Sequence, residues 1–171
     1  RFNFNTSLVR SMNGMFYSCT SLVSLDLTNF VTSLVTSMGN MFKECISLIS
    51  IDLSSFDTRN VLTMESMFTN DKSLISLDLS NFNITSTKKL SYLLSGCKSL
   101  VFVNLNSWEE NPDAGITSML NSVNKNLIYC INEEKSNKIN NLLQKFSKNN
   151  DCDNICFSEA RKIIIDKKIN R

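Results

Sequence analysis

The residues that could do chemistry in this chain are its six cysteines and its aspartates, because the sequence contains no histidine. The absence of His excludes the His-containing catalytic triads, the Cys–His dyads and most catalytic zinc sites. The sequence also lacks a phosphate-binding P-loop and a Gly-rich dinucleotide turn. We therefore predict no catalytic residue, no enzyme activity, no cofactor and no metal site.

Three cysteines recur with the period of a repeat. Cys19 and Cys45 are 26 residues apart, and Cys97 lies two further periods along the chain, with Asp71 in the place between them. A ladder of metal ligands is one interpretation of this column. Because the spacing follows the repeat and Asp71 interrupts it, we instead predict buried free thiols, which pack as small hydrophobic groups.

The remaining cysteines, Cys130, Cys152 and Cys156, follow the repeats. We predict a disulfide that joins Cys130 to Cys152 or to Cys156, with the third cysteine left to pair elsewhere. Zinc is the alternative, but three cysteines without a histidine leave its tetrahedral coordination incomplete.

Polar residues form a second repeated column. Asp26, Asp52 and Asp78 alternate with inward-facing leucines, so they are predicted to face solvent on a strand and to stack at the ~4.8 Å spacing of neighbouring strands. One interpretation is an acidic, polar strip for a carbohydrate or cationic ligand, with Phe102 as the best contact anchor. The other is a solvated sheet in which each Asp bonds to neighbouring hydroxyls. The predicted strip comprises Ser24, Asp26, Thr28, Ser50, Asp52, Ser54, Ser76, Asp78, Ser80, Phe102, Asn104 and Asn106.

The element that positions these columns is a 26-residue unit present in four clear copies. Within each unit the apolar period changes from helical to extended. Val9, Met12 and Phe16 have the three- and four-residue spacing of a helix face, whereas Leu25 and Leu27 alternate as in a strand. The same register repeats in the aromatic column Phe4, Phe30, Phe56, Phe82 and Trp108.

One strand and one short helix per 26 residues is typical of leucine-rich repeats, which must stack to share a core. The predicted fold is therefore an α/β leucine-rich-repeat solenoid with a parallel β-sheet on the concave face and short helices opposite. We place the solenoid at residues 1–131, with a degenerate fifth unit after Trp108, and a helical, Cys-containing cap at 132–171. In the cap, 134–148 is predicted as an amphipathic helix and a second helix is predicted from Ser158.

The pattern C-x-x-L-x-x-L-D-L-S-x-F-x-T-x-x-V-x-x-M-x-x-M-F resembles the BspA-like family of leucine-rich-repeat surface proteins. It is filled almost completely by Cys45, Leu48, Ile51, Asp52, Leu53, Ser54, Phe56, Thr58, Val61, Met64, Met67 and Phe68. The fourth unit departs from it, because Thr87 replaces Val and leucines replace the Met-Met-Phe trio. The resemblance implies export or surface display and a role in adhesion.

Composition restricts the partners. The net charge is only +2 and its charges are spread evenly along the chain, so we predict no nucleic-acid partner. No apolar run reaches the roughly 20 residues of a membrane span. The sequons at Asn5 and Asn83 are candidate glycosylation sites.

These observations predict an extracellular or cell-surface recognition and adhesion module for a protein or glycan. The alternative is a structural spacer, or a filament subunit built by end-to-end stacking of repeats. Val9, Met12 and Phe16 have no preceding repeat to cover them in this sequence. We therefore expect the N-terminal repeat face to be continued upstream or to self-associate.

Overall fold

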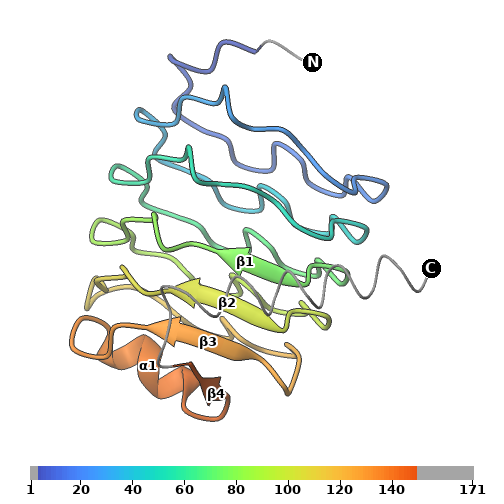
Figure 1. Cartoon of the computed structure of the whole chain (residues 1–171). Coiled ribbons are helices and arrows are strands. Elements are labelled where there is room, and N and C mark those ends of the chain that lie inside the picture. Colours follow the sequence, from blue (N-terminus) through green and yellow to red (C-terminus); the bar gives the residue numbers. More distant parts are fainter. Residues whose placement is uncertain (1–3, 150–171) are drawn as a thin grey trace.

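The computed structural model describes residues 4–149, in which segments 26 residues apart lie side by side (Figure 1). Parallel bridges join Ser11 to Ser37, Ser37 to Thr63, Thr63 to Lys89 and Lys89 to Gly115. We call each 26-residue segment a layer, the first of which contains Ser11. The bridges place equivalent residues of successive layers in columns.

A four-stranded parallel sheet forms at the C-terminal end of this arrangement, in the order β1-β2-β3-β4. The strands are β1 (Ser76–Asp78), β2 (Phe102–Leu105), β3 (Ile128–Ile131) and β4 (Ser147–Lys148). From β1 to β3, paired residues of neighbouring strands are one 26-residue repeat apart in the sequence. Leu77 pairs with Val103, and Val103 pairs with Tyr129. The first two layers contain no strand, although residues 22–28 and 48–54 have the same alternating sequence.

The predicted α/β leucine-rich-repeat solenoid, with a short helix in each repeat opposite the sheet, is wrong. Within residues 4–149 the one α-helix is α1 (Asn137–Leu143), which follows the repeats, and the sheet has only four strands. The segments that were predicted as repeat helices are runs of turns. Their three- and four-residue apolar spacing is real, but it arises from consecutive tight turns.

Backbone hydrogen bonding explains why these turns are not helices. The N–H groups of Met12 and Phe16 donate to the carbonyls of Ser37 and Met41 in the next layer, each at 2.8 Å. Between them, the Met15 N–H donates three residues back, to Met12, whereas an α-helix requires a bond four residues back. Two positions of every layer also have positive φ, which an α-helix does not tolerate. These residues are Gly14, Ser18, Asn40, Glu44, Ser66, Asn70, Tyr92, Gly96, Ser118 and Ser122.

The core consists of apolar columns that run through the layers. Phe16, Phe42 and Phe68 stack face to face, with ring centroids 5.4 and 5.5 Å apart. A second column contains Phe56 and Phe82, whose rings are nearly parallel at 6.4 Å. Burial of the predicted aromatic column from Phe30 to Trp108 is confirmed, because all its members are at most 8% exposed.

The C-terminal part differs from the predicted 134–148 helix, because α1 has only seven residues and the chain then enters β4. Ile139 and Leu143 bury the inner face of α1 in the core. The Glu110 carboxylate, from a neighbouring loop, accepts the N–H groups of Lys138 and Ile139 at 2.9 and 3.0 Å and thereby caps the helix. The predicted helix from Ser158 lies outside the described residues. No helix in the described part is long and apolar enough to cross a membrane.

The first prediction concerns the aromatic column. Phe56→Ala should lower the free energy of unfolding by about 3–5 kcal/mol, as truncation of a buried Phe does, because Phe56 is 3% exposed. Phe4→Ala is a matched control in the same column, where the ring is 54% exposed, and it should cost less than about 1 kcal/mol. Equal losses in urea titrations would contradict the burial difference.

Candidate functional site

The predicted strip becomes progressively less accessible from the first layer to the fourth. Its members in the first two layers are exposed, those of the third are half-buried, and only Asn106 of the fourth is not buried. The exposed part of the predicted strip therefore lies in the first two layers. It consists of Ser24, Asp26, Thr28, Ser50, Asp52 and Ser54.

The aspartates of the strip fix the turn that follows each extended segment. Asp26 Oδ1 accepts the Thr28 N–H at 3.1 Å and the Thr28 hydroxyl at 2.7 Å. Asp52 Oδ1 accepts the Ser54 N–H at 2.9 Å, and hydrogen bonds from Ser54 lower the pKa of the Asp52 carboxyl. The same contact recurs from Ser80 to Asp78 and from Asn106 to Asn104, so one oxygen in each column position has a structural role. The carboxylate of Asp52 is nevertheless exposed and ionised at neutral pH.

Phe102 is not the exposed contact anchor that the sequence predicted. Its side chain is only 5% exposed and packs with Cys130 and Ile128 in a small cluster beside the main core. Asn104 is 7% exposed, so the fourth layer contributes little surface to the strip. In β2 the alternating sequence does not indicate which side chains face solvent, because all four residues of the strand are buried.

The repeat cysteines are free thiols, but only two of them are buried. Cys45 and Cys97 donate from Sγ to the carbonyls of Phe16 and Phe68 at 3.1 and 3.0 Å. Burial raises the pKa of Cys45 to about 12 and that of Cys97 further still, so neither is a reactive thiolate. Cys19 is exposed, which contradicts its predicted burial.

Cys130 is disulfide-bonded. Cys152 and Cys156 lie outside the described residues, so the choice of partner stays a prediction. Within residues 4–149, no group of three or more Cys, Asp or Glu side chains is placed to hold a metal ion.

Asp71 occupies the buried cysteine column and is an ionisable group without full pairing. It is 0% exposed; its Oδ1 accepts the Cys45 N–H at 2.8 Å, whereas its Oδ2 has no hydrogen-bond partner. Removal from water raises the pKa of this carboxyl to about 9, and the nearby Glu44 adds to the rise. Asp71 is therefore a neutral acid at pH 7.

The second prediction follows from this pKa. The unfolded chain releases the Asp71 proton near pH 3.8, whereas the folded chain keeps it until about pH 9. Protonation thus favours the folded state below this window, and the advantage is lost as pH rises through it, at up to about 1.4 kcal/mol per pH unit. Asp71→Asn keeps an acceptor for Cys45 and cannot ionise. Its free energy of unfolding relative to the native chain should increase from pH 5 to pH 8 in urea titrations, and a constant difference would contradict a buried neutral acid.

A column of buried threonines, which the sequence interpretation missed, joins successive layers. The Thr6 hydroxyl accepts the Val31 N–H at 2.8 Å and donates to the Val31 carbonyl at 3.0 Å. Thr32 makes the same pair of bonds with Asp57, and so does Thr58 with Asn83. We call this pair of bonds the threonine clamp. The signal in the sequence is a threonine that recurs at 26-residue spacing, two positions after the aromatic column.

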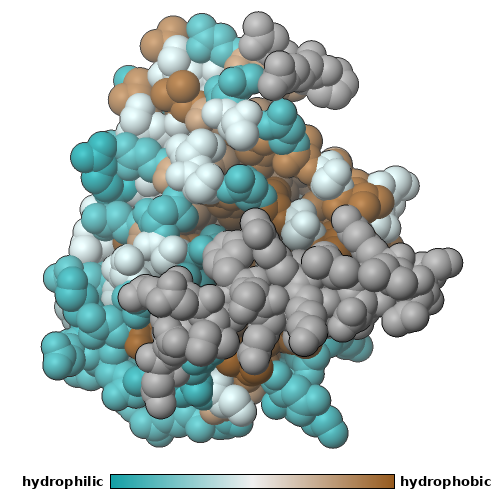
Figure 2. Space-filling model, in the orientation of Figure 1, coloured by the Kyte–Doolittle hydropathy of each residue, from teal (hydrophilic) through white to brown (hydrophobic). Residues whose placement is uncertain are grey.

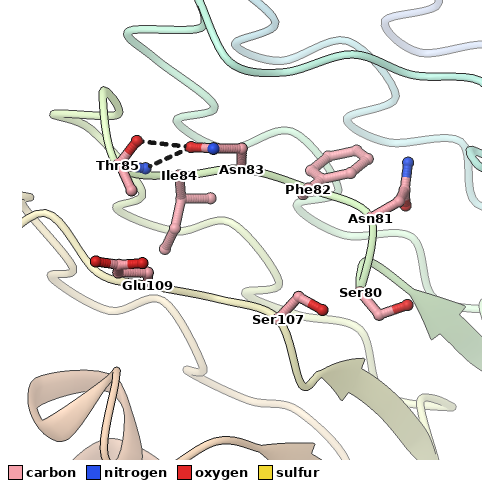
Figure 3. A pocket seen from close by; sticks show the side chains of 8 residues that line it. All are labelled: Ser80, Asn81, Phe82, Asn83, Ile84, Thr85, Ser107 and Glu109. Carbon is pink, nitrogen blue, oxygen red and sulfur yellow. Dashed lines mark hydrogen bonds between the residues drawn. The ribbon is translucent and has the colours of Figure 1, made fainter.

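A chain of clamps ends at Ile84, which takes the place of the next threonine. A pocket of about 230 Å³ lies at this position, between the segment 80–85 and the residues Ser107 and Glu109 of the next layer (Figure 3). Asn83, one of the predicted glycosylation sites, is part of its lining.

A family model described as "Mycoplasma protein of unknown function, DUF285" matches residues 10–132. The chain belongs to this family. No curated protein and no solved structure matches the chain. The DUF285 match contains the exposed strip, the buried Asp71 and the pocket at Ile84, and it ends before α1 and β4.

The asparagines of both candidate sequons of this DUF285 chain are exposed, whereas the residues that follow them, Thr6 and Ile84, are buried. Asn5 Oδ1 accepts the Ser7 N–H at 3.1 Å, and Asn83 Oδ1 accepts the Thr85 N–H and hydroxyl at 3.1 and 2.7 Å. In each case the amide oxygen holds a local turn. Glycosylation at these positions stays a prediction.

Proposed function

We propose that this DUF285 chain is an extracellular or cell-surface recognition module that binds a protein or glycan partner. The proposal rests on the exposed strip of the first two layers, which presents hydroxyls and carboxylates on a repeated scaffold. Asp26 and Asp52 are each held by a turn hydrogen bond, so their geometry is set before a ligand arrives. Preorganised polar groups of this kind reduce the entropic cost of binding.

The chemistry of the strip favours a ligand with hydroxyl or cationic groups. The Asp52 carboxylate, with one oxygen engaged in a turn, retains lone pairs that accept hydrogen bonds. The side chains of Ser24, Ser50 and Ser54 add hydroxyls that donate and accept. Because the polar groups of the strip recur once per layer, they also suit a partner that has a repeated structure of its own. Surface display is supported by the resemblance to the BspA-like surface proteins.

The third prediction tests the strip directly. The chain should bind members of an array of immobilised glycans and extracellular-matrix proteins. The double variant Asp26→Asn/Asp52→Asn should weaken that binding at least about tenfold, equivalent to about 1.4 kcal/mol. Asn preserves the turn acceptor, as Asn104 does in the fourth layer, so the fold is retained.

Asp113→Asn is the control for this experiment, because it makes the same chemical change at an exposed position away from the strip. It should leave binding unchanged. Absence of binding to every class on the array, or an equal loss in both variants, would reject recognition through the strip.

A second candidate function, end-to-end self-association, is favoured by unpaired backbone groups of opposite polarity in the first and last layers. In the part of the chain that the structure describes, the carbonyls of Ser11, Asn13, Met15 and Tyr17 accept no hydrogen bond, although their equivalents in the second layer do. The N–H groups of Ile116, Ser118, Leu120 and Ser122 likewise have no acceptor there.

This polarity restricts how two copies can associate. Two N-terminal layers placed face to face would bring carbonyl against carbonyl, whereas a head-to-tail arrangement brings N–H groups to carbonyls. Apolar side chains accompany the free carbonyls, since Leu8 is 83% and Met15 41% exposed. Figure 2 shows hydrophobic residues on the surface at this N-terminal end of the molecule.

The fourth prediction concerns this association. In sedimentation equilibrium the average mass of the chain should rise with concentration, and Leu8→Glu/Met15→Glu should keep it monomeric. Leu62→Glu changes an exposed leucine of an inner layer and should leave the association intact. A native chain that stays monomeric at every concentration would refute end-to-end association.

A further inference from the structure

The sheet is buried on both of its sides in the fourth and fifth layers. Alternate residues of a strand point to opposite sides of a sheet. Val103 and Tyr129 belong to the main core, whereas the cluster of Phe102 and Cys130 lies on the other side. We call this other side, which also carries the predicted strip, the outer face. Phe102 is 5% exposed and Cys130 is 0% exposed, so a segment of protein must cover the outer face here.

No described helix or strand supplies this cover. Within residues 4–149, β4 extends the sheet by pairing with β3, and α1 buries Ile139 and Leu143 in the main core. Figure 1 shows β1, β2 and β3 side by side, with α1 at the end of the stack beyond β3. The burial is graded along the outer face, because Ser76 in β1 is half-buried and Ser50 in the second layer is exposed. The covering segment therefore starts at the C-terminal layers and reaches as far as β1.

The C-terminal segment of the chain starts beside this face. The Asn149 N–H donates to the Tyr129 carbonyl at 2.9 Å, so the chain leaves the described part next to β3. Cys130 is disulfide-bonded, and the three repeat cysteines are free. By elimination, the partner of Cys130 is Cys152 or Cys156. Because Cys130 points to the outer face, the disulfide fixes the segment that follows Asn149 to that side of the sheet.

The composition of the segment complements the outer face. Residues 157–171 contain four isoleucines, which match the apolar cluster around Phe102. They also contain five basic residues against two acidic ones, whereas the strip carries the carboxylates of Asp52 and Asp78. The isoleucines are Ile163, Ile164, Ile165 and Ile169, and the basic residues are Arg161, Lys162, Lys167, Lys168 and Arg171.

The segment is also long enough. From β3 to the second layer the distance is about 14 Å, which is three steps of the ~4.8 Å strand spacing. An extended chain covers this distance in about five residues. Tethering by the disulfide makes the contact intramolecular, so a weak interaction is sufficient to keep the face covered.

We propose that residues 150–171 are the intramolecular partner of the outer face. The Cys130 disulfide holds the segment at β3, and its isoleucines cover Phe102. Its basic residues are directed toward Asp78 and Asp52, where they compete with an external partner. This competition rests on the proposed recognition function and adds its regulation, because the chain itself sets how much of the strip is accessible.

Hydroxyl-radical labelling of the full chain, read by mass spectrometry, tests the cover. In the variant Ile163→Asp/Ile164→Asp/Ile165→Asp, labelling of Phe102 should increase several-fold. Phe82, which is 1% exposed in the main core, should stay unlabelled and reports on unfolding. The matched control Leu8→Asp/Val31→Asp/Leu62→Asp introduces the same charges at exposed apolar residues outside the extended segments and should leave Phe102 protected. Continued protection of Phe102 in the isoleucine variant overturns the proposal.

Two further measurements keep the test decisive if the isoleucine variant does not fold. Reduction of the native chain with a water-soluble phosphine should increase Phe102 labelling and leave Phe82 unlabelled. Lys167→Glu/Lys168→Glu, which reverses charge only, should act in the same direction. Unchanged labelling in both cases rejects the segment as the cover. An increase in Phe102 labelling when the native chain is diluted would assign the cover to a second copy and would equally overturn the proposal.

Partner binding separates this inference from the proposed function. On the array of glycans and matrix proteins, the isoleucine variant should bind at least about threefold more tightly than the native chain, because a competing state lowers apparent affinity. Exposure of Phe102 without a gain in binding rejects the competition and leaves the recognition function intact. If neither chain binds anything on the array, the recognition function fails, while Phe102 labelling still decides whether the segment covers the outer face.

Discussion

The structure depends on backbone hydrogen bonds between residues one layer apart on the side opposite the sheet. In one segment of each of the first four layers, alternate N–H groups donate to the next layer at 2.7–3.0 Å, and intervening N–H groups close tight local turns. The segment runs from Met12 to Ser18 in the first layer and from Leu90 to Gly96 in the fourth. Buried backbone groups must be paired, and this arrangement pairs them without a helix or a long strand. It also fixes the register at one repeat, so every side-chain column follows from it.

Because the register is fixed, a residue type repeated in the sequence becomes a column with one physical role. The stacked phenylalanines exclude water, the threonine clamps join neighbouring layers, and the strip aspartates hold turns. A residue that interrupts a column therefore changes the chemistry in one layer only. Asp71 puts an incompletely paired acid into the core, and Ile84 leaves the backbone of Glu109 without its usual hydroxyl.

Sequence periodicity predicted the 26-residue unit and the buried aromatic column, but not the local conformation of the repeat. Apolar residues spaced three and four apart line one face of a helix and equally one face of consecutive turns. The decisive difference is positive φ at two positions per layer, which are occupied by Ser, Asn, Glu or Tyr as well as Gly, so composition gave no warning. Phe102 and Cys19 were misassigned for a related reason: burial at the two ends of the repeats depends on what packs beyond them, not on the period.

The same reasoning explains why candidate binding residues are hard to identify from the repeat alone. Positions that recur in every layer are largely occupied by contacts within the molecule; the column of Ser55 and Asn81, for example, donates to carbonyls of the preceding layer. Groups left for a partner are those with a spare lone pair, such as the carboxylate of Asp52. Under the proposed recognition function, specificity therefore rests on the groups that contacts within the molecule leave unengaged, while the repeat itself supplies rigidity and spacing.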